Sequence, residues 1–357
     1  MSETQNHIKR ISKTVEDWLK PDNFELMQAI DQTVNEGLFS FEDIKFQILS
    51  LKKSLREENL QRWARISGLK AGSIAGKRIL CLHAGNLPLV GFQDLLSVIM
   101  TGGSYLGKLS KKDPYLLPTL LQSFQKHGIA DDAKWAADLD GFSGLKSDAV
   151  LFAGSKQSAI SVEKKLGSLK LADQSTPKLM RTAHFSIAWI HDNNKKTMED
   201  LTEAVFRYGG AGCRSVAIVV APFHLNSQKC SFTDYVEAFW LKNPQHQNPP
   251  ESLFHRFAFN KAAGIEQAWL NDFLIEENLE KPEHKFILHW INGGEQTLKE
   301  IINSFRDGLQ SVYSTGEMVG KEIGGFITEP LSEAQSPPIW WKPDGVDTIQ
   351  WLQQKLS

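Results

Sequence analysis

The chain has 357 residues, of which 41% are hydrophobic, and this length and composition support two folded domains and exclude a disordered protein. Its 40 basic and 42 acidic residues give a net charge of −2 and are dispersed, so we expect no nucleic-acid partner. The three cysteines, Cys81, Cys213 and Cys230, lie far apart and show no metal-ligand spacing. Neither a disulfide framework nor a bound metal is therefore expected.

The first 66 residues are predicted to be helical. Residues 40–43, Ser-Phe-Glu-Asp, resemble a helix-capping box, and apolar residues follow at helical spacing from Ile44 to Leu55. No stretch approaches the roughly 18 apolar residues of a membrane span, and the first 20 residues do not resemble a signal peptide. We expect an N-terminal helical segment over 1–66 in a cytoplasmic protein without a membrane span.

Strands and helices are predicted to alternate beyond residue 78. Short apolar runs predict strands at 78–83, 104–108, 147–155 (with a turn into a helix) and 184–190. Helices are predicted between them, one ending near residue 100 and one over 115–126. This alternation indicates a parallel sheet covered by helices, an architecture that commonly binds nucleotides. The chain lacks both a complete phosphate loop and a G-x-G-x-x-G motif, which disfavours P-loop NTPases and ordinary Rossmann dehydrogenases.

The most suggestive segment is Gly-Gly-Ala-Gly-Cys at 209–213, between a predicted helix and the strand at 216–220. Three glycines permit unusual backbone angles and can present a thiol in a loop. A thiolate can attack a thioester carbonyl, and neighbouring N–H groups can bind the resulting oxyanion. The alternative for Cys213 is a small buried side chain after a helix cap, and on the cysteine alone that interpretation is the more common one.

Three weaker candidates also have structural alternatives. Gly154 and Ser155 form a strand-to-helix turn that suits a phosphate, although such turns are usually helix caps. Asn86, in a Gly-Asn-Leu-Pro turn, is either a turn former or an oxyanion donor. His184 is predicted to be a core histidine, and it is the visible candidate for a Cys/His dyad.

Taken in chain order, these segments resemble the aldehyde-dehydrogenase superfamily, and most closely its LuxC-type fatty acyl-CoA reductase branch. The resemblance covers roughly residues 75–357. It rests on Gly-Asn-x-Pro at 85–88, Lys-x-Ser at 108–110, Phe-Ala-Gly-Ser at 152–155, the Gly-rich segment ending at Cys213, Asn-Ser…Gly-Leu within 302–312, and Pro-Asp-Gly-Val at 343–346.

The resemblance implies an α/β fold of aldehyde-dehydrogenase type, with a Rossmann-type cofactor domain and a second α/β catalytic domain. We expect the nucleotide-binding domain over 67–205, the catalytic domain over 206–335 and a C-terminal return segment over 336–357. The implied activity is NAD(P)H-dependent reduction of an acyl-CoA substrate to an aldehyde, through an acyl-enzyme on Cys213.

The resemblance also implies roles for individual residues. Asn86 and the Cys213 backbone N–H would stabilise oxyanions, Lys108 would contact the adenosine ribose, and Gly154 with Ser155 would contact the pyrophosphate. Where relatives often carry a glutamate that favours NADH, this chain has Ser110 and Lys111. We therefore expect NADPH as cofactor, with NADH as the alternative if Lys111 and Lys112 form only a solvated pair.

The glutamate that activates water in hydrolytic relatives is replaced here by Leu-Met-Arg at 179–181. An acyl-enzyme without a general base should react with a thiol or a hydride rather than with water. The alternatives are an acyl phosphate reductase on the same fold, a cysteine acyltransferase or thioesterase without a redox step, and a non-catalytic partner. Cys81 and Cys230 are expected to be structural, and a homo-oligomer is expected.

Overall fold

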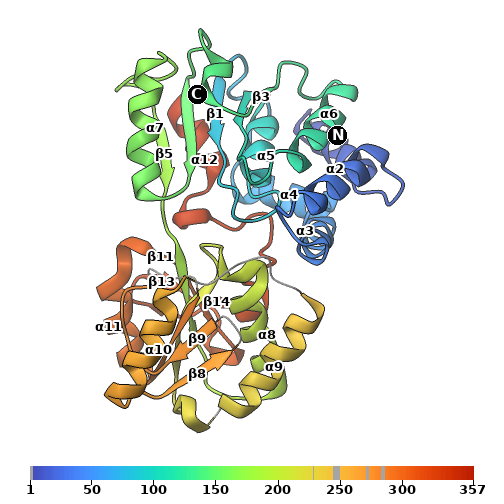
Figure 1. Ribbon diagram of the computed structural model, residues 1–357. Coiled ribbons are helices and arrows are strands. Elements are labelled where there is room, and N and C mark those ends of the chain that lie inside the picture. The colour runs from blue at the N-terminus through green and yellow to red at the C-terminus, as the bar shows by residue number, and fades with distance from the viewer. Residues whose placement is uncertain (1–2, 228, 244–249, 271–272, 283–285) are drawn as a thin grey trace. The chain divides into compact units, whose positions relative to one another are not determined.

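The computed structural model describes residues 3–227, 229–243, 250–270, 273–282 and 286–357 (Figure 1). The chain divides into two compact units, unit 1 with Met1–Thr182 and Pro338–Ser357, and unit 2 with Ala183–Pro337. The predicted boundary at 205/206 is therefore misplaced. Residues 183–205 belong to unit 2, because their strand pairs with strands of unit 2.

The N-terminal segment is helical, as predicted, with α1 (Glu3–Trp18), α2 (Phe24–Asn35), α3 (Phe41–Ser54) and α4 (Glu57–Ile66). Ser40 caps α3, since its hydroxyl accepts a hydrogen bond from the Asp43 N–H at 3.1 Å. The helices are part of unit 1 rather than a separate domain. Trp18 shows why: its fully buried indole donates to the Thr119 hydroxyl of α6 (Leu116–Lys126) at 2.8 Å.

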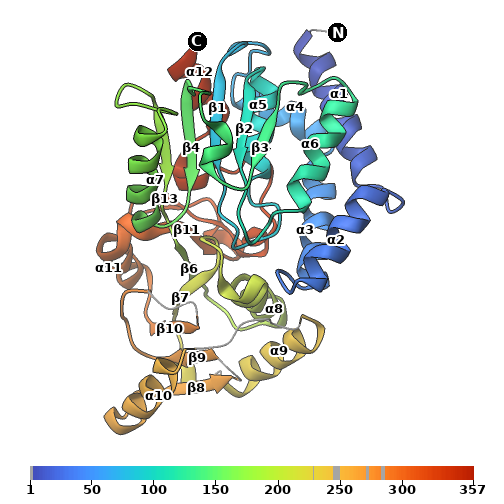
Figure 2. The same cartoon turned by 45° about the horizontal axis from the view of Figure 1, so that its top comes forward.

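Unit 1 contains a five-stranded parallel sheet in the order β3-β2-β1-β4-β5. Its strands are β1 (Arg78–Leu82), β2 (Ser104–Lys108), β3 (Lys134–Ala136), β4 (Ala149–Ala153) and β5 (Lys178–Arg181). Figure 2 shows β4, β1, β2 and β3 side by side. The predicted strands in this region are confirmed, whereas β3 and β5 were not predicted.

Both faces of this sheet are covered by apolar cores. Ile79 and Cys81 of β1 belong to the core with α5 (Phe92–Thr101), α6, α12 (Thr348–Leu356) and the N-terminal helices. Leu80 and Leu82, which point to the other face, belong to the core with α7 (Lys156–Ser168) and the 3₁₀ turn η1 (Leu139–Phe142). A strand buried on both faces has a continuous apolar sequence, which is why β1 was recognisable.

The chain order of the strands defines a switch point between β1 and β4. From β1 the chain continues to β2 and β3 on one side of β1, and then to β4 and β5 on the other. The loops that follow β1 and β4 therefore leave the carboxyl edge in opposite directions, the place where open α/β sheets bind ligands.

Unit 2 contains a seven-stranded sheet in which only the β8–β9 pair is antiparallel among the described pairs. In sheet order the strands are β14 (Glu329–Pro330), β11 (Leu309–Ser314), β6 (Phe185–Trp189), β7 (Val216–Ala221), β10 (Ile287–Asn292), β9 (Phe273–Glu276) and β8 (Gln267–Leu270). A separate hairpin joins β12 (Glu322–Ile323) and β13 (Phe326–Ile327).

Helices cover both faces of this sheet too. Apolar residues of α8 (Lys195–Phe206), α9 (Lys229–Lys242) and α10 (Ser252–Ala263) pack on the face that includes Ala188 of β6. Residues of α11 (Glu295–Phe305) pack on the face that includes Ile187 and Trp189. The alternation along β6 assigns each side chain to one face of the sheet.

After unit 2 the chain returns to unit 1 at Pro338. The helix α12 packs on α5, and Asp347 at its N-terminus accepts a hydrogen bond from the Ser67 hydroxyl at 2.7 Å. The returning residues therefore complete the core of unit 1 rather than forming a tail.

Candidate active site

The loop that carries Cys213 has an unusual backbone. It follows α8 through the 3₁₀ turn η2 (Arg207–Gly210) and ends at the start of β7. Tyr208, Gly209 and Gly210 have φ angles of 57°, 63° and 70°, so three consecutive residues are left-handed. This conformation suits glycine but strains tyrosine, and such strain is concentrated at functional sites.

Arg207 holds the start of this loop. Its buried guanidinium pairs with Glu203, with 2.5 Å between Nε and Oε1, and donates to the side chain of Asn243 at 2.6 Å. It also lies over the ring of Phe239, 4.8 Å from its centroid. These contacts fix the segment in which the left-handed turn begins.

The other end of the loop is held by two serines. The Ser186 hydroxyl of β6 donates to the Cys213 carbonyl oxygen at 3.0 Å, and the Gly212 N–H donates to the Ser215 hydroxyl at 3.2 Å. The Cys213 side chain is partly exposed. A partly exposed thiol on a loop fixed at both ends has the placement that a nucleophile needs.

In unit 1, two predicted segments lie against each other at the carboxyl edge of the sheet. A Cβ atom on Gly85 would lie 1.9 Å from the Ser110 hydroxyl oxygen, so only glycine fits there. The Leu89 N–H donates to the Asp113 carboxylate at 2.6 Å, which holds the left-handed Leu89 (φ 58°) in place. The turn with the half-buried Asn86 is thereby fixed beside the residues that follow β2.

Lys108 is the last residue of β2 and is half-buried. Burial, together with the positive charge of Lys111, lowers the pKa of Lys108, and Asp138 opposes this only in part. Among the described residues its ammonium has no hydrogen-bond or ion-pair partner, whereas Lys111 and Lys112 are exposed. A half-buried cation of this kind suits a ligand that brings hydroxyl or phosphate oxygens.

Gly154 and Ser155 both have structural roles. Ser155 is the N-cap of α7, and its hydroxyl accepts a hydrogen bond from the Ser158 N–H at 3.1 Å. A Cβ on Gly154 would lie 2.6 Å from the ring of Phe152, so packing alone requires the glycine. Their contact with a pyrophosphate stays a prediction.

His184 is not the core histidine that the sequence predicted. It precedes β6 and is exposed, because the strand begins one residue later. Its ring packs against Phe185 at 5.3 Å and over Gly308, where a Cβ would lie 2.4 Å from the imidazole. A dyad with Cys213 stays a prediction.

The other cysteines differ from Cys213. Cys81 is fully buried in β1, and burial raises the pKa of its thiol well above the usual value, which supports a structural role. The side chain of Cys230 lies outside the described residues.

The sequence did not reveal a buried ion pair where β5 ends. The Arg181 guanidinium donates to both carboxylate oxygens of Asp94, at 2.7 and 2.9 Å, and to the Thr348 hydroxyl at 2.6 Å. The two charged side chains are 6% and 8% exposed. Both Asp94 oxygens are occupied, so this carboxylate is unsuited to activating water.

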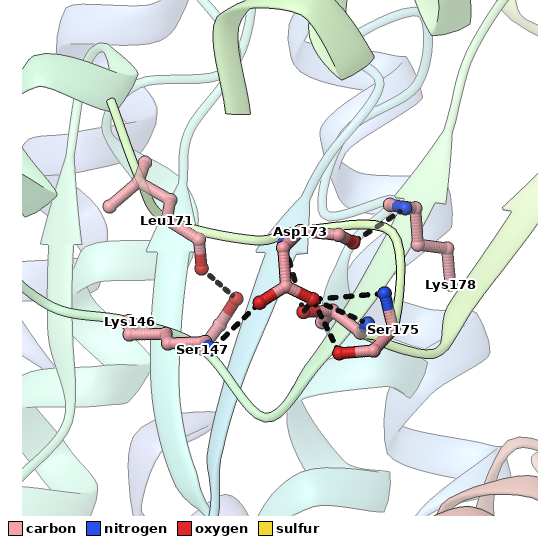
Figure 3. A network of polar contacts seen from close by, with 7 residues as sticks. Lys146, Ser147, Leu171, Asp173, Ser175 and Lys178 are labelled. Atoms are coloured by element: carbon pink, nitrogen blue, oxygen red, sulfur yellow. Dashed lines mark hydrogen bonds and ion pairs between the residues drawn. The ribbon is translucent and has the colours of Figure 1, made fainter. Parts of the chain in front are cut away.

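At the opposite, amino edge of the same sheet, polar groups satisfy one another. The Asp173 carboxylate accepts hydrogen bonds from Lys146 at 2.7 Å and from the backbone and hydroxyl of Ser175 (Figure 3). Lys146 holds the pKa of Asp173 below its usual range. A cavity of about 510 Å³ lies beside this loop, and the Lys146–Asp173 ion pair is part of its lining. We assign this cavity no function.

Within the described residues, no group of three or more His, Cys, Asp or Glu side chains is arranged to hold a metal ion. In the same part of the chain, no helix is long and apolar enough to cross a membrane.

No family model and no curated protein sequence matches the chain. Solved structures match along nearly its whole length. Aldehyde dehydrogenase 21 from Physcomitrella patens superposes with a TM-score of 0.64 at 11% identity, covering 99% of this chain and 84% of its own. A salicylaldehyde dehydrogenase from Pseudomonas putida G7 gives a TM-score of 0.59 at 14% identity, covering 88% and 73%.

The fold is that of the aldehyde dehydrogenases. A third structure, assigned as a methylmalonate-semialdehyde dehydrogenase from Sinorhizobium meliloti 1021 and solved with NAD, gives a TM-score of 0.60 at 12% identity, covering 88% of this chain and 73% of its own. At such identities the likeness establishes the aldehyde-dehydrogenase fold, and the predicted fold class is confirmed.

Proposed function

We propose that this protein is a nicotinamide-dependent acyl-CoA reductase of the LuxC type, with Cys213 as the residue that carries the acyl group. The observation that supports this most is a partly exposed thiol in a strained, doubly anchored loop of an aldehyde-dehydrogenase fold. Backbone strain clusters at active sites, and a nucleophile needs a fixed position.

The proposed reaction starts with the thiolate of Cys213. Its sulfur attacks the thioester carbonyl, the bond to the sulfur of CoA breaks, and CoA leaves as a thiolate that takes up a proton from solvent. The acyl group is then held on Cys213 as a thioester. The Cys213 backbone N–H and the side-chain amide of Asn86, by the resemblance, donate hydrogen bonds to the oxyanion.

The residues at the carboxyl edge of unit 1 fit a nicotinamide dinucleotide. Lys108 offers a half-buried ammonium without a partner among the described residues, and Gly154 and Ser155 follow β4 at the start of α7. We propose NADPH over NADH, because the side chains of Ser110 and Lys111 would donate hydrogen bonds to the 2′-phosphate. When bound, the cofactor supplies the hydride that reduces the acyl group to an aldehyde.

Arg181 supports reduction over hydrolysis. By the resemblance, hydrolytic relatives carry their general base at the position where β5 ends; here it is occupied by the buried Arg181, which pairs with both oxygens of Asp94. An acyl-enzyme in this protein therefore lacks a general base at that position and persists long enough to be reduced.

The proposal is tested by following NADPH consumption with acyl-CoAs of increasing chain length, with aldehyde as the expected product. Intact-protein mass spectrometry without the cofactor should detect an acyl adduct on Cys213. Reduction of acyl phosphates alone would identify the other reductase, and CoA release without nicotinamide oxidation would identify an acyltransferase or thioesterase. Efficient oxidation of aldehydes to free acids without CoA would contradict the role given to Arg181.

Asn86→Ala tests the oxyanion role. We expect kcat/KM for acyl-CoA to fall by about 10²-fold, the usual effect of removing one oxyanion donor. The midpoint of thermal unfolding should stay unchanged. If stability and activity fall together, Asn86 is a turn former instead.

A further inference from the structure

A buried tyrosine on β11 has an unsatisfied hydroxyl. Tyr313 is 1% exposed, and its hydroxyl forms no hydrogen bond with any described residue. Burying a hydroxyl without a partner lowers stability, so such a group calls for an explanation.

Tyr313 lies on the face of the sheet that supports the Cys213 loop. It is paired with Ala188 of β6, and both side chains belong to the same apolar core. Ser186 is two residues before Ala188, so its side chain points to that face as well. The Ser186 hydroxyl is the group that holds the Cys213 carbonyl.

The charges around Tyr313 keep its hydroxyl protonated. Burial, and then the carboxylate of Glu329 on the neighbouring β14, raise the pKa of Tyr313 far above its usual value. Cys213 acts in the same direction, whereas Arg214 and the nearby Ser311 hydroxyl act in the opposite one. The Ser311 hydroxyl donates to the Glu329 carboxylate at 3.2 Å and so leaves the tyrosine without a partner. Cys213 is thus among the groups whose charge acts on this hydroxyl.

We propose that Tyr313 is a positioning residue, whose buried hydroxyl donates a hydrogen bond to the sulfur of Cys213 when that sulfur is ionised. A neutral thiol is a weak acceptor, whereas a thiolate is a strong one, so the bond favours the reactive form. The inference rests on the proposed role of Cys213 as the nucleophile.

The experiment is alkylation of Cys213 by iodoacetamide between pH 5 and 10, with peptide mass spectrometry to follow that cysteine alone. In Tyr313→Phe the midpoint of the pH profile should move up by about one unit, the size expected for one charge-assisted hydrogen bond. Tyr235→Phe is the matched control, because Tyr235 of α9 is half-buried against the same core. Its profile should match that of the parent.

The thermal unfolding midpoint separates this role from a structural one. Removing an unsatisfied hydroxyl should leave the midpoint of Tyr313→Phe unchanged or raise it. A lower midpoint, a failure to fold, or an unshifted alkylation profile would overturn the inference.

Alkylation needs no acyl-CoA, so this inference and the proposed function can fail separately. A shifted profile in a protein that reduces no acyl-CoA would support Tyr313 and reject the substrate. Reduction of acyl-CoA with an unshifted alkylation profile would support the substrate and reject the role of Tyr313.

Discussion

Each unit contains a buried tyrosine and a cysteine associated with the same sheet, but the two pairs differ in how their polar groups are satisfied. In unit 1, the Tyr105 hydroxyl is hydrogen-bonded to Nε2 of His83 at 2.5 Å, and Cys81 is fully buried. In unit 2, the Tyr313 hydroxyl has no partner among the described residues, and Cys213 is partly exposed.

The difference distinguishes a structural cluster in unit 1 from a pair in unit 2 that suits catalysis. Burial lowers the pKa of His83 to about 4, so this imidazole is neutral near pH 7 and completes a closed cluster with Tyr105. In unit 2 a buried, protonated hydroxyl shares a face of the sheet with the loop of a partly exposed cysteine, which suits a charge that forms only during reaction.

The largest expected difference is between the two cysteines. Cys213→Ala should reduce acyl-CoA reduction to background, because no other described thiol is partly exposed, while nicotinamide binding persists. Cys81→Ala should retain the chemistry and lose only about 1 kcal/mol of stability, for one small buried atom. Steady-state assays and cofactor titrations measure both effects, and a Cys213→Ala enzyme with normal turnover would remove the basis of the comparison.

The next prediction tests whether unit 1 binds the cofactor at the carboxyl edge of its sheet rather than at the buried cluster of His83 and Tyr105. Lys111→Glu should shift the ratio of kcat/KM for NADPH over NADH toward NADH by about 10- to 100-fold, since a carboxylate repels the 2′-phosphate. Lys112→Glu is the control, because it is equally charged, adjacent and exposed. Equal effects of the two variants would mean that only overall charge matters.

A smaller effect sharpens the contrast between the tyrosines. Tyr105→Phe leaves the buried Nε2 of His83 without its partner and should lower the free energy of unfolding by about 1–3 kcal/mol. Tyr313→Phe breaks no described hydrogen bond and should cost almost nothing. Urea unfolding of the two variants measures the difference, and equal losses would show that both hydroxyls are structural.

The smallest effect concerns pH. The pKa of His83 falls to about 4 from an ordinary 6.5, so its contribution to stability is complete above 6.5 and is lost as pH falls toward 4. Burial raises the pKa of Asp113 from 3.8 to about 6, so its contribution has the opposite sign and is lost as pH rises through 6.

Between pH 4 and 6 the two contributions offset each other, and single variants separate them. In Asp113→Asn the free energy of unfolding should rise with pH more steeply than in the parent, by about 1 kcal/mol per pH unit. In His83→Gln it should rise less steeply by a similar amount. Urea unfolding at several pH values measures both slopes, and unchanged slopes would mean that these groups titrate normally.

The sequence predicted the fold where local patterns were strong. The strand at 104–108 matches β2 residue for residue, and Ser40 caps α3 as expected. β3 and β5 escaped prediction because they have only three and four residues and begin or end with charged side chains. The unit boundary was misplaced because β6 is as apolar as the strands of unit 1, and only its pairing with β7 and β11 assigns it to unit 2.

Prediction of the site had a similar limit. The glycines of the Cys213 loop were visible in the sequence, but the left-handed backbone of Tyr208 could not be predicted from its residue type. The pairing of Arg181 with Asp94 joins residues 87 positions apart, and the place of Tyr313 depends on strand register. Contacts between distant parts of a chain leave no local pattern in a single sequence.

The return of the chain to unit 1 has a consequence for folding during synthesis. Unit 2 is an insertion within unit 1, so a ribosome delivers all of unit 2 before residues 338–357. These late residues supply Thr348, which accepts a hydrogen bond from the buried Arg181, and Asp344, which accepts one from the Thr182 N–H. Most of unit 1 is thus synthesised first but is completed last. Unit 2 can fold before the core of unit 1 is complete.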